Sequence, residues 1–424
     1  MELLRDLVNS SVIRVEHRLL DEIKSWSLYS PFWYLCAREA RKEKLFHVLE
    51  TYPNSFNESV ESQRRFCILN NTLLGIKDVH NSIKSITTVH SLLCTGPEHC
   101  YPVPLFTGLK LLRVLDALAI RFYHFPDQVL KSIHLRYLAL TYSGNVPASI
   151  SRLWNLQYLI VRQHMNIKNS SEDQSYLPIT IWDLQELKHL QIMGSNLPEP
   201  YVGALLPNLL SLLDISVNSC TKEILEKLPM LKKLGVRIEL EPDDIEPMYP
   251  FHHLSVLGEL KSFKCVIVNP NFNRSQIVSP PTHFRTFPVC LKKLSLGGFG
   301  YPWESIRVIA QLPKLKVLKL RCYAFRGPEW VIHDGEFRNL RFLLLEDADL
   351  VHWKAPNLSI DQLIIRHCYK LKEVPTFFLD TSYNIELVDC PYIVDSVQQF
   401  RKENCPYADD PPIHCSWHEE KPTL

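Results

Sequence analysis

The sequence has no long apolar run and no excess of one charge. None of its apolar stretches approaches the ~18 residues of a membrane-spanning helix. The residues that follow Met1 lack the uninterrupted apolar core of a signal peptide. Lys and Arg number 47 against 46 Asp and Glu, so the whole-chain charge indicates neither a nucleic-acid partner nor an acidic tail.

The sequence also lacks the usual signatures of metal binding and catalysis. None of its 12 cysteines forms a C-x-x-C pair, and its 17 histidines, including His252 and His253, lack ligand spacing. We therefore expect no metal, and free, mostly buried thiols in a reducing compartment. No G-x-x-x-x-G-K-[ST] loop is present, and the glycine-rich stretch 297–300 predicts a turn rather than a phosphate site. No motif supports an enzyme.

What the sequence does contain is a repeat, seen most clearly at Ile360–Pro375. This stretch reads L-x-x-L-x-L-x-x-C-x-x-L, with isoleucine at two of the leucine positions. Leu363 and Ile365 point to one face of a short strand, because side chains alternate along a strand. One such strand buries almost nothing, so the unit requires neighbours.

The neighbours recur roughly every two dozen residues, the interval typical of leucine-rich repeats. The expected repeat starts are Val89, Leu112, Leu135, Leu156, Leu187, Leu210, Leu231, Leu260, Leu291, Leu315, Leu340, Ile360 and Ser382. The predicted fold is an α/β leucine-rich-repeat solenoid, a curved parallel sheet of about 13 irregular repeats, with a small helical N-terminal remnant.

The chain divides into four predicted segments. Residues 1–50 read as helix, hairpin and helix, the second helix opening at Pro31, and predict a truncated winged-helix-like segment. Residues 51–82 read as a connector that includes a strand near Phe66. Residues 83–395 form the predicted repeat domain, and 396–424 a C-terminal cap followed by a disordered tail.

The segments between strands carry further order. Pro126, Pro147 and Pro178 precede the return turns, where a fixed proline backbone suits 3₁₀ structure. Inserted loops are expected at 166–176 and 269–285. Polar residues after the third apolar position satisfy backbone groups between coils, with these candidates: Asn218, Cys368, Cys390, Ser143 and Ser195.

The residues between the apolar positions face the concave side of the predicted sheet, and they are strongly basic. The expected partner-binding residues are Arg136, Arg162, Lys188, Lys232, Lys233, Arg237, Lys264, Lys292, Lys293, Lys319, Arg321 and Arg366. Further basic residues at such positions are Arg113, Lys261, Lys316 and Arg341. The acidic residues at such positions are Asp116, Asp214, Glu346, Asp361 and Glu386.

Two interpretations of this basic surface compete on equal terms. Lysine is a common filler of exposed strand positions, so the surface would serve only solubility. Alternatively it complements an acidic protein surface and helps encounter and orientation. Nucleic acid is a weaker third interpretation, because few exposed aromatics (Tyr137, Tyr158 and Phe342) accompany the basic residues.

Several long signatures closely resemble the late-blight-resistance group of plant intracellular immune receptors. They are the segment 324–330 with 335–337 and 343–347, the stretch ending at Pro375, the V-D-C-P-Y run at 388–392 and the S-L-L-C-T-G-P run at 91–97. In that family a coiled-coil domain, a nucleotide-binding switch domain and a winged helix precede the repeats. The resemblance covers only the end of the winged helix and the repeats.

The resemblance implies recognition of pathogen effectors, restraint of the switch domain, and defence with localised cell death. The family's methionine/valine-His-Asp motif falls at Leu28-Tyr29-Ser30, where neither the histidine nor the aspartate is present. We therefore expect no cofactor, and ATP or ADP only if an upstream nucleotide-binding domain exists.

These expectations combine into one interpretation. The chain is a non-catalytic binding module whose partner is a pathogen effector or the acidic surface of a switch domain. It is expected in the cytoplasm, also at the nucleus or the membrane periphery, without nucleic acid or metal. The alternative is a degenerate, non-signalling scaffold with no remaining partner. A receptor-kinase ectodomain is disfavoured, because the sequence shows neither signal peptide nor membrane helix.

Overall fold

The computed structural model describes residues 2–19, 22–43, 45–53, 63–101, 109–163, 176–240, 250–268, 280, 284, 287–355, 358–375, 384–393 and 413–416. They fall into two compact units, each described by itself. Unit 1 comprises Met1–Ile215 and Glu223–Leu231, and unit 2 comprises Ser216–Lys222 and Lys232–Leu424.

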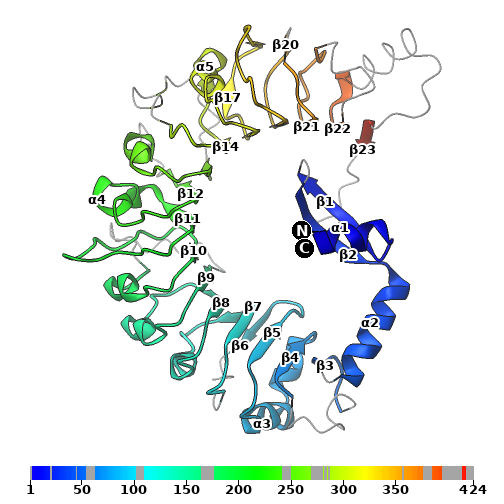
Figure 1. Cartoon of the computed structure of the whole chain (residues 1–424), viewed down its shortest axis with the longest axis vertical. Coiled ribbons are helices and arrows are strands. Elements are labelled where there is room, and N and C mark those ends of the chain that lie inside the picture. Colours follow the sequence, from blue (N-terminus) through cyan, green and yellow to red (C-terminus); the bar gives the residue numbers. More distant parts are fainter. Residues whose placement is uncertain are drawn as a thin grey trace. The chain divides into compact units, whose positions relative to one another are not determined.

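Unit 1 begins with the predicted helix, hairpin and second helix (Figure 1). These are α1 (Glu2–Asn9), the antiparallel pair β1 (Ile13–Leu19) and β2 (Glu22–Leu28), and α2 (Ser30–Lys42). The predicted opening of the second helix at Pro31 agrees with α2, whose second residue is this proline.

The rest of unit 1 contains a parallel sheet, in which most strands pair with the next strand along the chain. Its strands are β3 (His47–Leu49), β4 (Arg65–Ile68), β5 (Ser91–Cys94), β7 (Val114–Phe122), β8 (Tyr137–Tyr142), β9 (Tyr158–Arg162), β10 (His189–Ile192) and β11 (Ser211–Ser216). β6 (His99–Tyr101) pairs with the end of β7. The sheet thus reaches back through the segment expected to be a connector.

Unit 2 carries a second series of parallel strands. They are β12 (Lys233–Ile238), β13 (Ser262–Ile267), β14 (Lys293–Gly297), β16 (Val317–Arg321), β19 (Phe342–Glu346), β21 (Gln362–Arg366), β22 (Asn384–Val388) and β23 (Ile413–Ser416). Two short parallel pairs lie beside it: β15 (Tyr301–Pro302) with β17 (Phe325–Arg326), and β18 (Glu329–Val331) with β20 (His352–Lys354). One strand per repeat confirms the leucine-rich-repeat solenoid.

Short helices connect most strands. In unit 1 they are η2 (Asn71–Gly75), α3 (Lys77–Ser85), η3 (Asp127–Lys131), η4 (Ala148–Arg152) and η5 (Ile179–Asp183). In unit 2 they are η6 (Val217–Ser219), η7 (Pro250–Val256), η9 (Trp303–Ile306) and α5 (Arg307–Ala310). α4 (Lys222–Leu225) spans the sequence boundary of the units.

The expected proline turns are confirmed. Pro126, Pro147 and Pro178 immediately precede η3, η4 and η5, and each proline carbonyl accepts a hydrogen bond from the residue three positions later. Proline fits this position because its missing N–H has no partner to lose at a helix start.

One repeat start is wrong by a single residue. Leu209, rather than Leu210, is buried in the first apolar position, and the N–H groups of Leu210 and Ser211 both donate to the Lys188 carbonyl. Asp214 then adopts a left-handed φ of 59°, which turns Ile215 back into the core. Consequently Asn218 is exposed and does not bridge coils.

Cysteines bridge coils where the sequence predicts them. The Cys368 thiol donates to the Leu345 carbonyl of the preceding repeat at 3.9 Å, and the Cys390 thiol donates to that of Ile365 at 3.6 Å. Asn71 bridges coils at a position that the repeat pattern does not indicate: it is fully buried, and its side-chain amide donates to the carbonyls of Pro97 and Ala119 at 2.9 and 3.3 Å.

The remaining sequence expectations concern the loops and the tail. Most of the predicted inserts at 166–176 and 269–285, the start at Ser382 and the predicted cap from 396 lie outside the described residues. Of the segment predicted as a cap and a disordered tail, the structure describes only β23 (Ile413–Ser416), which pairs with β22.

Candidate functional site

The strand register separates core side chains from outward ones. In β14, Leu294 and Leu296 are buried, whereas Lys293 and Ser295, which precede them, are partly exposed. The same alternation in register-matched neighbours stacks equivalent side chains into rows, because parallel strands lie ~4.8 Å apart. A residue type repeated at one outward position therefore becomes a continuous row.

The row just before each strand is fixed by paired hydrogen bonds. The Lys261 carbonyl accepts from the N–H groups of both Lys292 and Lys293, at 2.9 and 3.0 Å. The Lys292 carbonyl likewise accepts from Lys316 and Val317, at 2.8 and 3.0 Å. This backbone arrangement holds the lysine side chains at regular intervals in a row that crosses the N-terminal ends of the strands.

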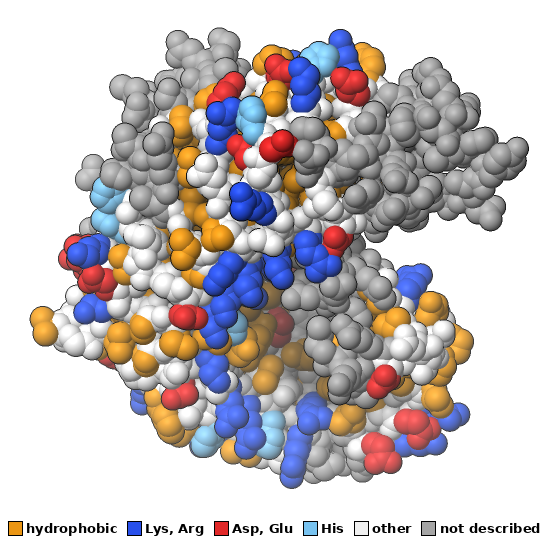
Figure 2. Space-filling model, turned by 45° about the horizontal axis from the view of Figure 1, so that its top comes forward, with side chains coloured by type: hydrophobic (Ala, Val, Ile, Leu, Met, Phe, Trp, Pro, Cys, Tyr) orange, Lys and Arg blue, Asp and Glu red, His pale blue; other side chains and the backbone are white. Residues whose placement is uncertain are grey.

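In unit 2, lysines gather on four neighbouring strands, β12, β13, β14 and β16. We call them the lysine face: Lys232, Lys233, Lys261, Lys264, Lys292, Lys293, Lys316 and Lys319. The outward positions of these four strands carry no carboxylate. On the face that Figure 2 draws, several lysine and arginine side chains lie next to one another in a row.

Lys319 is a partly buried charge within the lysine face. Its ammonium lies 5.4 Å from the centre of the Phe342 ring, within cation–π range. Burial lowers the pKa of Lys319, the like charges of Arg321, Lys293 and Arg366 lower it further, and Glu346 opposes the shift. Burial is thus the main cause of the shift, and the neighbouring positive charges add to it.

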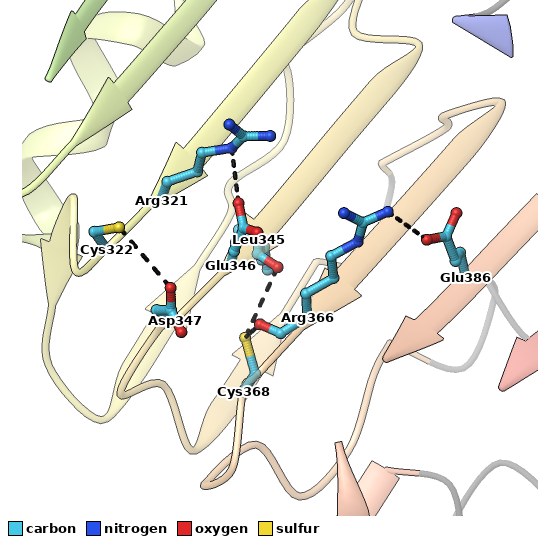
Figure 3. A network of polar contacts seen from close by, with 8 residues as sticks. All are labelled: Arg321, Cys322, Leu345, Glu346, Asp347, Arg366, Cys368 and Glu386. Carbon is cyan, nitrogen blue, oxygen red and sulfur yellow. Dashed lines mark hydrogen bonds and ion pairs between the residues drawn. The ribbon is translucent and has the colours of Figure 1, made fainter. Parts of the chain in front are cut away.

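Three arginines of the predicted site each have a carboxylate partner. Arg237 pairs with Glu239 at 2.8 Å. Figure 3 shows the other two pairs, Arg321 with Glu346 at 2.8 Å and Arg366 with Glu386 at 2.6 Å. Counting every arginine as unpaired positive charge, as the sequence pattern alone suggests, overstates the basic surface at these ends of the strands.

The other predicted site residues lie in unit 1. Arg136 and Arg162 are exposed, just before β8 and at the end of β9, and Lys188 is half-buried just before β10. Between them runs a row of rings that sequence reasoning did not identify as a unit. Tyr137 and Tyr158 lie 5.6 Å apart, and Tyr158 stacks on His189 at 4.3 Å. The repeat spacing of the two tyrosines was the available signal.

Among the described residues, no group of three or more His, Cys, Asp or Glu is arranged to hold a metal ion. The glycine stretch is the predicted turn, with positive φ at Gly298 and Gly300. Nine cysteines among the described residues are free thiols. Burial raises the pKa of the Cys94, Cys220 and Cys265 thiols, which disfavours the nucleophilic thiolate.

Because the folded protein favours the protonated thiol of Cys220, its stability should fall at alkaline pH. Burial raises the pKa of the Cys220 thiol from about 9 to about 12. Its contribution is therefore complete below pH 9 and is lost as the pH rises toward 12, where the unfolded thiol is ionised. We expect the free energy of unfolding to fall by up to about 1.4 kcal/mol per pH unit for this thiol.

Urea unfolding followed between about pH 8 and 11 tests that slope. The Cys220→Ala variant should lose stability less steeply with pH than the parent, whatever its stability at neutral pH. Parallel slopes for the two proteins would contradict the assignment.

No helix among the described residues is long and apolar enough to cross a membrane.

Comparison with known proteins agrees with the repeat architecture. A family model described as a leucine-rich repeat region matches residues 88–351. A putative late blight resistance protein homolog of Solanum demissum is 32% identical over 306 residues, covering 67% of this chain and 21% of the relative. A second such homolog of the same species is 27% identical over 415 residues, covering 89% of this chain and 32% of the relative.

The chain thus spans only a minor part of the length of these relatives. Among solved structures, a leucine-rich repeat protein of Leptospira interrogans is 16% identical, with a TM-score of 0.43, covering 87% of this chain and 93% of that one.

Proposed function

This chain belongs to the leucine-rich repeat region family, and on that premise we propose that it is the recognition module of a plant disease-resistance receptor. Its lysine face binds an acidic protein surface, either of a pathogen effector or of a nucleotide-binding switch domain. The observation that carries the proposal is the concentration of lysines on β12, β13, β14 and β16 without a carboxylate at their outward positions.

The electrostatic argument rests on geometry rather than on net charge. The whole chain is nearly neutral at +1, so long-range attraction between entire molecules is weak. Lysines held ~4.8 Å apart across strands reinforce one another locally, and such a patch steers an acidic partner and suppresses basic ones. The carboxylates of Glu239 and Glu346 pair with arginines, which reduces their competition with a partner for the lysines.

Nucleotide binding is not part of the proposed function of this segment. The position of the family's His-containing motif runs from Leu28, the last residue of β2, through Tyr29 to Ser30, the first residue of α2. Tyr29 is exposed, and none of the three residues supplies an imidazole or a carboxylate. These residues therefore cannot make the contacts to ADP that the histidine and aspartate of the motif would make.

The competing proposal is a degenerate scaffold whose lysines serve only solubility. The two proposals differ in the effect of charge position. If the lysine face is a specific binding surface, the partner's affinity falls only when charges within the face are reversed. If the lysines serve only solubility, the parent protein does not bind the partner.

Charge reversal on the lysine face therefore tests the function. We expect Lys264→Glu with Lys292→Glu, both exposed residues, to weaken binding to a separately expressed switch domain of a late blight resistance homolog. The loss should be about tenfold or more at low ionic strength and smaller at high salt, because salt screens exposed charges. Titration calorimetry over a salt series provides the measurement.

The matched control is Lys131→Glu with Lys370→Glu, which makes the same charge change at exposed positions outside the lysine face. The control should bind like the parent. If the parent shows no complex with the switch domain at low salt, that partner is rejected. Equal losses in the two double variants would reject the lysine face.

We also propose a cytoplasmic location and a non-enzymatic role. The cysteines assigned as free include the buried Cys94, Cys220, Cys265, Cys368 and Cys390. Free thiols in a folded core are typical of reducing compartments, which supports the location.

A further inference from the structure

A second surface, in unit 1, has a chemistry different from that of the lysine face. It begins with the ring row formed by Tyr137, Tyr158 and His189 on the neighbouring strands β8, β9 and β10. The centroid distances are 5.6 Å between the tyrosines and 4.3 Å between Tyr158 and His189. All three side chains are half-buried, so part of each ring reaches solvent.

The orientation of these rings limits what the row can bind. The rings of Tyr158 and His189 lie in nearly parallel planes, with an interplanar angle of 18°, and stack face to face. The faces between them are therefore occupied by each other, and the rims remain for a partner. Nucleobases stack on ring faces, so this row is a poor platform for single-stranded nucleic acid. An aromatic rim carries partial positive charge, which favours carboxylates and the faces of partner rings.

Arginines border the ring row and add full positive charge. Arg113 and Arg136 are exposed at equivalent positions just before β7 and β8, and the Arg113 carbonyl accepts the N–H groups of Arg136 and Tyr137 at 2.8 and 3.1 Å. Arg162 is exposed at the end of β9, and Lys188 is half-buried just before β10.

Two carboxylates on the strands that flank this row, β7 and β11, accept hydrogen bonds within the chain. Asp116 accepts from the Leu118 N–H at 3.3 Å, and Asp214 accepts from the Gln191 side chain at 2.6 Å. Burial raises the pKa of Tyr137, the Asp116 charge raises it further, and the Arg162 charge opposes this. Asp116 and Arg162 thus both act on the tyrosine.

An exposed apolar ridge precedes the same strands. Leu111, Ile133 and Trp154 lie in the turns before β7, β8 and β9, with relative exposures of 43%, 45% and 59%. The side chain of Asn155 donates to the Ile133 carbonyl at 3.3 Å, which ties two of these turns together. Trp, Tyr and Arg are the residues that dominate binding energy in protein interfaces, and here all three occur within three adjacent repeats.

We propose that the ridge, the arginines and the ring row together bind an extended acidic segment of a partner protein that carries an aromatic residue. The aromatic side chain packs on Trp154 and its apolar neighbours. The flanking carboxylates meet Arg113, Arg136 and the positive ring rims. This site is independent of the lysine face and does not rest on the function proposed for it.

A synthetic peptide tests the proposal with the whole chain. The probe is a fluorescein-labelled peptide of Asp and Glu residues with one central Trp. Two comparison peptides replace the Trp by Ser, or all acidic residues by Asn and Gln. Fluorescence anisotropy at low ionic strength should show the acidic Trp peptide bound at least about tenfold more tightly than either comparison peptide, because each lacks one half of the contact.

Variants then locate the bound peptide. Arg113→Glu with Arg136→Glu, and separately Trp154→Ala, should each weaken binding about tenfold. The matched controls are Lys77→Glu, an exposed charge on α3, and Trp33→Ala, on α2 with 54% exposure. Lys264→Glu with Lys292→Glu should leave the peptide affinity unchanged, which separates this site from the lysine face.

Three outcomes would overturn the proposal. The first is equal binding of the neutral and acidic peptides, and the second is equal loss of binding in the Trp33→Ala and Trp154→Ala variants. The third is tighter binding of an oligothymidylate than of the acidic Trp peptide with the same dependence on Arg113 and Arg136. That result would assign the surface to nucleic acid instead. Far-UV circular dichroism of each variant shows that the fold is retained.

Discussion

Replacing Trp330 with alanine is expected to lower the free energy of unfolding of unit 2 by about 3–5 kcal/mol. Trp330 is 1% exposed and lies in the middle of a stack of three indoles, 4.8 Å from Trp303 and 5.3 Å from Trp353. The interplanar angles of 17° and 4° keep the rings in near-parallel contact. The substitution would remove both contacts and leave a cavity that rigid strands on either side cannot close.

Urea unfolding of the whole chain, followed by circular dichroism, measures this loss. Because each repeat of a solenoid contacts mainly its neighbours, amide hydrogen exchange should show the greatest loss of protection in β18 and β20, which carry Trp330 and Trp353. Trp33→Ala is the control, since its side chain is exposed, and it should change stability by less than about 0.5 kcal/mol. Similar destabilisation by the two substitutions would refute a structural role specific to the stack.

A second large effect is expected from Gly96→Ala in unit 1, a loss of about 1–3 kcal/mol or more. A β-carbon at this position would clash with the Leu69 carbonyl oxygen and would lie 2.8 Å from the Asn71 backbone nitrogen. Both are backbone atoms, so no side-chain rotation relieves the clash. A shift of this segment would also disturb the Asn71 side chain, whose amide bridges the carbonyls of Pro97 and Ala119.

Gly258→Ala provides the matched control for that substitution. A β-carbon at Gly258 meets nothing within 4 Å, and its backbone is not in the left-handed region. The control should be neutral or stabilising by up to about 1 kcal/mol, because alanine restricts the unfolded chain. Midpoints of urea unfolding compare the two variants, and equal midpoints would show that the close approach at Gly96 does not constrain the fold.

The residues that carry the family resemblance turn out to be largely structural. In the stretch 324–330, Phe325 stacks on Trp303 at 5.4 Å, and Trp330 forms the centre of the indole stack. Gly327, at a φ of +127°, accepts a hydrogen bond from the Trp303 indole at 3.1 Å through its carbonyl. This signature therefore reports the packing of neighbouring repeats and does not locate a binding surface.

Most strands and return turns were predictable because their causes are local. An apolar residue at every second position of a short segment has one way to bury its side chains, so Leu363 and Ile365 indicate their strand directly. Proline acts on its own φ and its missing N–H, so Pro147 and Pro178 indicate the starts of η4 and η5 without reference to any neighbour. The hairpin and helices at the N-terminus followed from similar short-range patterns.

The remaining features depend on contacts between residues distant in sequence. Whether Arg321 is available or paired is decided by Glu346 on the next strand. The register near Leu209 depends on a left-handed turn at Asp214, which an aspartate permits but does not require. Tyr158 stacks on His189 although the two residues are 31 positions apart in the sequence. They meet because β9 and β10 are neighbouring strands, whatever the length of the loop that connects them. Periodicity therefore identifies which side chains face outward, whereas their charge pairing and ring orientation arise from the packing of one repeat on the next.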